Sequence, residues 1–146
     1  MSDFRHLTDD FWASPQIALE DVGEAKAQGI ALIINNRPEG EAADQVPGEV
    51  IEAAARAVGI DYRAIPVTHA GFSEEQVRAM AAAIGVAAGP VLAYCRSGTR
   101  STLLWALAQA AKGEAPDTIA ARAAGAGYDV APVRGLIDML AARRGD

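Results

Sequence analysis

The sequence has a single cysteine and two histidines among its 146 residues, which excludes several classes of site. The one thiol, Cys95, leaves no partner for an internal disulfide, a zinc ribbon or a two-cysteine redox pair within the chain. The two histidines, His6 and His69, lie far apart in sequence. We therefore expect neither a metal site nor a cofactor.

Long apolar runs are also absent, although 51% of the residues are hydrophobic. No stretch reaches the roughly 18 apolar residues of a transmembrane helix. The start, Met1 to His6, is polar and acidic where a secretory signal would be apolar, so we expect a cytoplasmic protein. Thirteen basic against 19 acidic residues give a net charge of −6. This charge disfavours nucleic acids and membranes as partners.

Repeats, low-complexity tracts and linkers are missing, which predicts a single domain over residues 1–146. Apolar runs bounded by turn residues predict the strands. They are two short strands around a turn within 4–13, then 30–34, 61–67 and 90–94. The runs at 30–34 and 90–94 lack polar alternation, as expected of strands buried on both faces.

Helical spacing of apolar residues alternates with these strands. The expected helices cover 17–28, 48–58, 73–84, 101–111, 116–124 and 130–143. Ser73 and Gln76 form a capping box, and Asp129 caps the last helix. The alternation predicts an α/β fold with a mostly parallel central sheet of about four or five strands flanked by helices.

Polar segments follow three of the predicted inner strands, at 35–37, 68–69 and 95–101. Parallel sheets bind ligands at the carboxyl ends of their strands. We therefore expect Arg37 and His69 to share one rim with the segment that begins at Cys95.

The segment after the last inner strand carries the candidate chemistry. The strand at 90–94 places Cys95 at its carboxyl end, the chain turns at Gly98, and a helix then begins. The backbone amides of this segment can therefore converge on one point. These amides, the helix dipole and a guanidinium all favour a negative charge there. We predict Cys95 as a thiolate nucleophile and Arg100 as its anion-binding partner. The other predicted anion-binding residues are Arg96, Ser97, Gly98, Thr99 and Ser101.

This segment, Tyr94-Cys95-Arg96-Ser97-Gly98-Thr99-Arg100-Ser101, resembles the catalytic loop of cysteine-dependent phosphatases and rhodaneses. From about Phe4 to Leu140 the chain resembles the phosphatase-like domain of the beta-lactamase-hydrolase-like family. The resemblance also rests on Pro15-Gln16, Asn36-Arg37-Pro38-Glu39 with Glu41, Ile65-Pro66-Val67, Leu104-Trp105 and Gly127-Tyr128-Asp129. It implies a fold like that of dual-specificity phosphatases. It also implies a persulfide-dioxygenase-like protein as a partner, since such a domain is often fused to this one.

Two departures from the phosphatase pattern favour sulfur chemistry. The spacing is Cys-x4-Arg, one residue shorter than in cysteine phosphatases and equal to that of rhodaneses. No aspartate lies between Tyr62 and Tyr94 to act as the general acid, and losing such an acid costs roughly 10²–10⁴-fold in rate. Persulfide transfer needs no acid. The main hypothesis is therefore a sulfurtransferase that moves sulfane sulfur through a Cys95 persulfide to an external thiol.

Two alternatives remain open. One is a weak phosphatase-like hydrolase with a phosphocysteine intermediate, and the other is a non-catalytic anion-binding module. In each case the partner is a small anionic sulfur or phosphate compound. His69 is a candidate rim acid. Arg37 is either a substrate contact or part of a salt bridge with the nearby Glu39 and Glu41.

Overall fold

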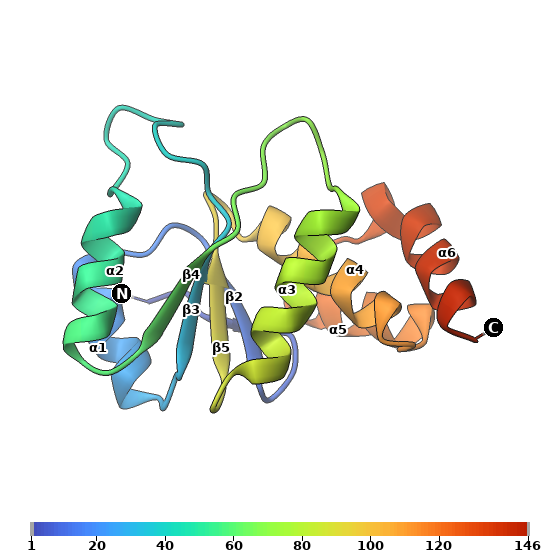
Figure 1. Ribbon diagram of the computed structural model, residues 1–146, viewed down its shortest axis with the longest axis horizontal. Coiled ribbons are helices and arrows are strands. Elements are labelled where there is room, and N and C mark those ends of the chain that lie inside the picture. Colours follow the sequence, from blue (N-terminus) through green and yellow to red (C-terminus); the bar gives the residue numbers. More distant parts are fainter. Residues whose placement is uncertain (1, 146) are drawn as a thin grey trace.

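The computed structural model describes residues 2–145, which form one five-stranded sheet with helices on both faces (Figure 1). The strands are β1 (Arg5–His6), β2 (Phe11–Ser14), β3 (Leu32–Asn35), β4 (Asp61–Ala64) and β5 (Val91–Tyr94). Their order in the sheet is β1-β2-β5-β3-β4. All neighbours pair in parallel except β1 with β2. The predicted α/β fold with a mostly parallel sheet is confirmed.

Six helices are present in the described part of the chain. They are α1 (Leu19–Ala27), α2 (Gly48–Ala57), α3 (Glu74–Val86), α4 (Thr99–Ala111), α5 (Pro116–Gly125) and α6 (Arg134–Gly145). In Figure 1, α1 and α2 cover one face of the sheet and α3 to α6 lie on the other. None of the helices in residues 2–145 is long and apolar enough to cross a membrane.

The inner strands send alternate side chains to two separate cores, because successive residues of a strand point to opposite faces. On β5, Val91 and Ala93 join the core under α3 and α4, while Leu92 and Tyr94 join the one under α1 and α2. Burial on both faces explains why these strands are continuous apolar runs.

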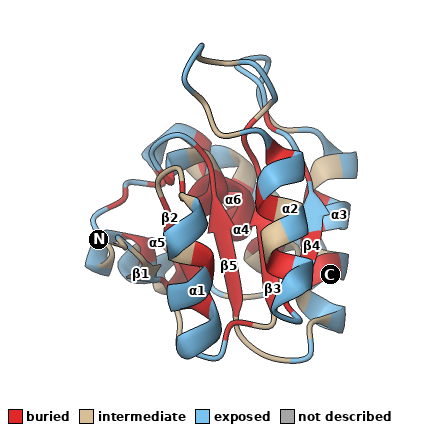
Figure 2. Cartoon of the chain, turned by 90° about the vertical axis from the view of Figure 1, so that its left-hand side faces the viewer, coloured by how far each residue is buried: buried red, intermediate tan, exposed pale blue. Residues whose placement is uncertain are grey.

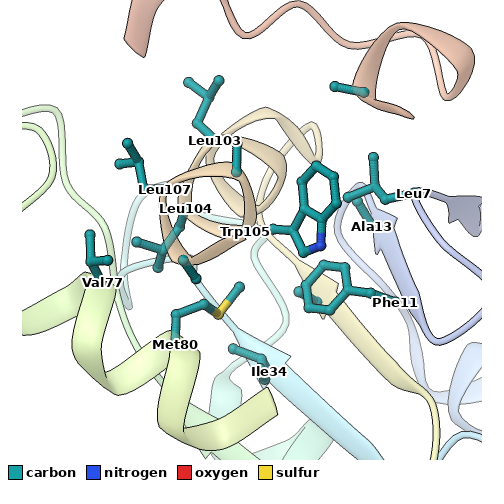
Figure 3. Packing of buried hydrophobic residues seen from close by; sticks show 14 of the residues in the cluster. Leu7, Phe11, Ala13, Ile34, Val77, Met80, Leu103, Leu104, Trp105 and Leu107 are labelled. Carbon is teal, nitrogen blue, oxygen red and sulfur yellow. The ribbon is translucent and has the colours of Figure 1, made fainter. Parts of the chain in front are cut away.

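Helix α4 is the most buried helix and runs through the centre of its layer (Figure 2). Every residue from Ser101 to Ala108 is buried, as expected of a helix that is packed all round. In Figure 3, Trp105 lies against Phe11 of β2, with ring centroids 6.1 Å apart. This packing holds α4, whose first residues, Thr99 to Ser101, end the segment from Cys95 to Ser101, called the cysteine segment below.

Helix ends account for most differences from the sequence-based expectation. The capping box of Ser73 and Gln76 starts α3 as predicted. The first helix begins at Leu19 instead of Ile17, because Ala18 is extended and its amide donates to the Asp21 carboxylate at 2.8 Å. The last helix begins at Arg134, after a 3-10 turn at 131–133 whose first amide is capped by Asp129.

Candidate active site

Three strand ends meet at one edge of the sheet, and the segments that follow them build the site. The loops after β3 and β4 both rise beyond this edge (Figure 1). The backbone joins them there: Asn36 N donates to the Tyr94 carbonyl at 2.8 Å, and Val67 N donates to the Asn36 carbonyl at 2.9 Å. The polar segments at 35–37 and 95–101 therefore share an edge, as the parallel topology predicts.

Cys95 lies at the end of β5 with its side chain fully buried, at 0% exposure. The Gly98 amide donates a hydrogen bond to its Sγ atom at 3.1 Å. Gly98 is the residue before α4 and has φ +90, a left-handed conformation that favours glycine. The strand, the glycine turn and the helix start thus place the sulfur beside an inward-pointing amide at a helix N-terminus, where negative charge is favoured.

The hydroxyl groups of the segment divide into two kinds. Ser97 Oγ donates to Thr99 Oγ1 at 3.0 Å and accepts from the Thr99 amide at 3.3 Å, so these two residues stabilise the turn. Ser101 Oγ is fully buried in the first turn of α4 and has no hydrogen-bond partner among the described residues. A buried hydroxyl without a partner is uncommon, so Ser101 keeps an unused donor and acceptor beside Arg100 in the sequence. Arg96 is exposed.

The guanidinium of Arg100 is held by two other loops. Its Nη1 atom donates to Glu41 Oε2 and to the Val67 carbonyl, both at 2.7 Å, and its Nη2 atom donates to Glu41 Oε1 at 2.8 Å. The hydrogen bonds to Glu41 are the main cause that raises the pKa of Arg100, and neighbouring Cys95 adds a smaller effect. Arg100 is therefore a fixed positive charge close to the nucleophile.

The bonds to Glu41 and Val67 use three donors of that guanidinium, and the other two donors make no further hydrogen bond to the residues that the structure describes. A guanidinium carries five N–H donors in a rigid planar fork. The Nη1 atom uses both of its donors and Nη2 uses one. The remaining Nη2 donor lies on the same edge as the Nε donor, so Arg100 can form two parallel bonds with a tetrahedral oxyanion.

Glu41 connects the two arginines of the rim. Besides Arg100, its carboxylate accepts from Arg37 Nε at 3.0 Å. The hydrogen bond with Arg100 is the main cause that lowers the pKa of Glu41 to about 2. Glu41 is consequently ionised at neutral pH and has no proton to give to a leaving group.

Arg37 is a member of this network. Its side chain is only 5% exposed, and its Nη1 atom donates to Gln16 Oε1 at 3.0 Å. Of the two roles considered from the sequence, the structure shows the salt bridge, made with Glu41. Glu39 instead accepts from the Gly48 amide at the start of α2, at 2.5 Å.

His69 lies on the loop between β4 and α3, and its side chain is exposed. In residues 2–145 that side chain has no hydrogen-bond partner, so the structure does not tie it to the cysteine segment. Its role as a rim acid stays a prediction. Over the same range, no group of three or more His, Cys, Asp or Glu side chains is placed to hold a metal ion.

Sequence reasoning did not anticipate two contacts of the site. One is the double hydrogen bond between Glu41 and Arg100, and the other is Tyr128, whose hydroxyl donates to the Ser97 carbonyl at 3.2 Å. Glu41 and Tyr128 both belong to the motifs that carry the family resemblance. That resemblance was the only signal in the sequence that pointed to them.

Taken together, the site offers a buried thiol, an inward amide and a guanidinium with two donors that bond none of the described residues. This set suits nucleophilic attack on a small tetrahedral anion, because the donors stabilise charge where it develops.

Comparison with known proteins identifies the family that the sequence motifs resemble. Residues 3–112 match the family described as the phosphatase-like domain of beta-lactamase hydrolase-like protein. A beta-lactamase hydrolase-like protein from Agrobacterium fabrum is 43% identical over 100 residues, which are 68% of this chain and 22% of that protein. The chain thus spans about a fifth of the length of this relative.

Solved structures agree with this match. A candidate phosphatase from Neisseria meningitidis is 33% identical and has a TM-score of 0.84, with 96% of this chain and 99% of that chain covered. A candidate phosphatase from Shewanella putrefaciens, 22% identical with a TM-score of 0.78, covers 100% of this chain and 95% of its own. The second likeness shows the fold alone. The expected phosphatase-like fold is confirmed.

Proposed function

The chain belongs to the family of phosphatase-like domains of beta-lactamase hydrolase-like proteins, and from that premise we propose that it hydrolyses phosphate monoesters through Cys95. The observation that carries this proposal is the buried Cys95 sulfur, which accepts from the Gly98 amide at 3.1 Å and neighbours Arg100, a guanidinium held by Glu41. The sequence alone favoured sulfur transfer. The phosphatase-like alternative fits the relatives better.

The proposed reaction has two steps. In the first, the Cys95 thiolate attacks phosphorus, a P–S bond forms, and the P–O bond to the leaving group breaks. In the second, water attacks the same phosphorus, the P–S bond breaks, and inorganic phosphate and the thiolate are released. The electron pair that forms each new bond comes from the attacking atom, so no oxidant, reductant or cofactor is needed.

Arg100 binds the phosphoryl oxygens through its Nε and Nη2 donors. Glu41 and the Val67 carbonyl hold the other three donors, two on Nη1 and one on Nη2, so the guanidinium does not have to be ordered when the substrate arrives. Preorganised donors of this kind act mainly in the transition state. The Gly98 amide then stabilises the thiolate when phosphate leaves the sulfur.

The leaving group receives little help from the protein. Glu41 is ionised, and the sequence between Tyr62 and Tyr94 contains no aspartate. We therefore propose that the enzyme prefers esters of acidic alcohols such as phenols, which leave without a proton. His69 is the one side chain we propose as a donor for less acidic alcohols.

The test compares two assays on one preparation, p-nitrophenyl phosphate hydrolysis and thiocyanate formation from thiosulfate and cyanide. We expect phosphatase activity that falls by roughly 10³-fold or more in Cys95→Ser, as for loss of a covalent nucleophile. His69→Ala should leave this activity within a few-fold, because p-nitrophenolate needs no acid. Phosphatase activity in Cys95→Ser equal to that of the wild type would contradict the proposal.

Sulfur transfer remains the second candidate, and the short Cys-x4-Arg spacing is the observation that favours it. In that reaction the Cys95 thiolate attacks the outer sulfur of thiosulfate and releases sulfite. Cyanide then takes the sulfur from the persulfide and restores the thiolate. Thiocyanate without phosphate release would select this candidate, while bound phosphate with neither product would indicate an anion-binding module.

A further inference from the structure

Tyr128 contacts the cysteine segment from a part of the chain that the family match, residues 3–112, does not include. It follows α5 and is largely buried. Its hydroxyl donates to the Ser97 carbonyl at 3.2 Å. Its ring and hydroxyl fill the space beside Gly98, where any added side chain would collide with them.

The hydrogen bond from Tyr128 acts on one particular peptide group. The Ser97 carbonyl and the Gly98 amide belong to the same peptide unit, which is planar and trans, so they point in opposite directions. The carbonyl accepts from Tyr128 and the amide donates to Cys95 Sγ at 3.1 Å. If this peptide turned over, a carbonyl oxygen would face the sulfur and repel its negative charge.

We propose that Tyr128 is a positioning residue that locks the Ser97–Gly98 peptide with its amide toward Cys95. The inference rests on the proposed function, since it assigns Tyr128 a role in holding the anion site formed by that segment. Tyr128 touches neither the substrate nor the reacting atoms in this role.

The surroundings of Tyr128 suit a fixed donor. The guanidinium carbon of Arg5 lies 5.2 Å from the centre of its ring, and Arg5 Nη1 donates to the Ala126 carbonyl at 3.5 Å. Burial is the main cause that raises the pKa of Tyr128, while Arg5 opposes the shift and Cys95 adds to it. The hydroxyl therefore keeps its proton at neutral pH and continues to donate.

The experiment replaces Tyr128 by Phe, which removes the hydroxyl and keeps the ring. One readout is kcat/KM for p-nitrophenyl phosphate. The other is the rate of Cys95 alkylation by iodoacetate divided by the rate with iodoacetamide, because the anionic reagent reports the anion site and the neutral one reports access. We expect both values to fall roughly 5-fold, the equilibrium factor for one hydrogen bond.

Tyr62→Phe is the matched control, since Tyr62 is equally buried and packs in the core on the other face of the sheet. Its hydroxyl accepts from Asn35 Nδ2 at 3.0 Å. Thermal unfolding of both variants measures any general loss of stability. The inference is overturned if Tyr128→Phe lowers only the melting temperature, or if Tyr62→Phe changes both readouts as much.

The alkylation ratio separates this inference from the proposed function. A wild-type protein with no preference for iodoacetate would contradict the anion site itself, and with it both proposals. A wild-type preference that Tyr128→Phe leaves unchanged would contradict the role of Tyr128 alone.

Discussion

Replacing Glu41 by Gln tests the network that holds Arg100. The carboxylate accepts from both Nη atoms of Arg100 and from Arg37 Nε, and its pKa is about 2 against an ordinary 4.5. At 1.36 kcal/mol per unit, this shift corresponds to about 3 kcal/mol of folding free energy at pH 7. The side chain of Glu41 is only 16% exposed, so solvent screening reduces this value little.

The same lowered pKa determines how the contribution of Glu41 to the free energy of unfolding depends on pH. A carboxylate whose folded pKa is lowered stabilises the protein fully above its unfolded pKa, here about 4.5, and loses that contribution as the pH falls through about 2. The contribution should be about 3 kcal/mol at pH 7 and about half of that at pH 3. The amide introduced by the substitution does not titrate, so the difference in unfolding free energy between wild type and Glu41→Gln should shrink accordingly.

Urea unfolding of both proteins between pH 7 and pH 3 measures this difference. The control is Glu52→Gln, which removes an ion pair with Arg56 in which both side chains are at least 41% exposed. We expect that control to cost less than about 0.5 kcal/mol. The reasoning is refuted if Glu41→Gln costs no more than Glu52→Gln, or if its cost is the same at both pH values.

Two further variants test the cysteine segment. Arg100→Lys keeps the charge but loses the planar fork that bonds Glu41 and the substrate together, so kcat/KM for p-nitrophenyl phosphate should fall by roughly 10²-fold, measured by steady-state kinetics. A loss below 3-fold would contradict the two-edge arrangement. Gly98→Ala must adopt φ +90 and collides with Tyr128, so urea unfolding should show a loss of about 1–3 kcal/mol. An unchanged stability would mean that this turn is not held as described.

The fold could be predicted from the sequence because its signals are local. The apolar run at 30–34 and the one at 90–94 became β3 and β5, which are buried on both faces. The Ser73–Gln76 capping box fixed the start of α3. Helix ends that depend on a single side-chain bond were less predictable, as at Ala18, where the Asp21 carboxylate keeps the chain extended for one more residue.

The site was only partly predictable for the same reason. Cys95, Gly98 and Arg100 lie within one strand–turn–helix segment, so their proximity follows from sequence spacing. The bond between Arg100 and Glu41 joins residues 59 positions apart, and the bond between Tyr128 and Ser97 joins residues 31 apart. No periodicity or motif spacing encodes contacts of that range, because they depend on how the loops after β3 and α5 pack.

The spacing of two residues and the match over most of the chain favour different reactions. The spacing of Cys95 and Arg100 favours sulfur transfer, since it equals that of rhodaneses. The fold and the family match, which rest on most of the chain, favour phosphatase chemistry. Both reactions need the same thiolate and the same guanidinium edge, so the site geometry serves either.

Intact-mass analysis of the quenched enzyme tests the central claim most directly. Wild-type protein is mixed with p-nitrophenyl phosphate, stopped in acid during turnover and digested to locate the modified residue. We predict the mass of one phosphoryl group on Cys95, and none in Cys95→Ser. An enzyme that releases phosphate while Cys95 stays unmodified, or carries the group on another residue, would contradict the account.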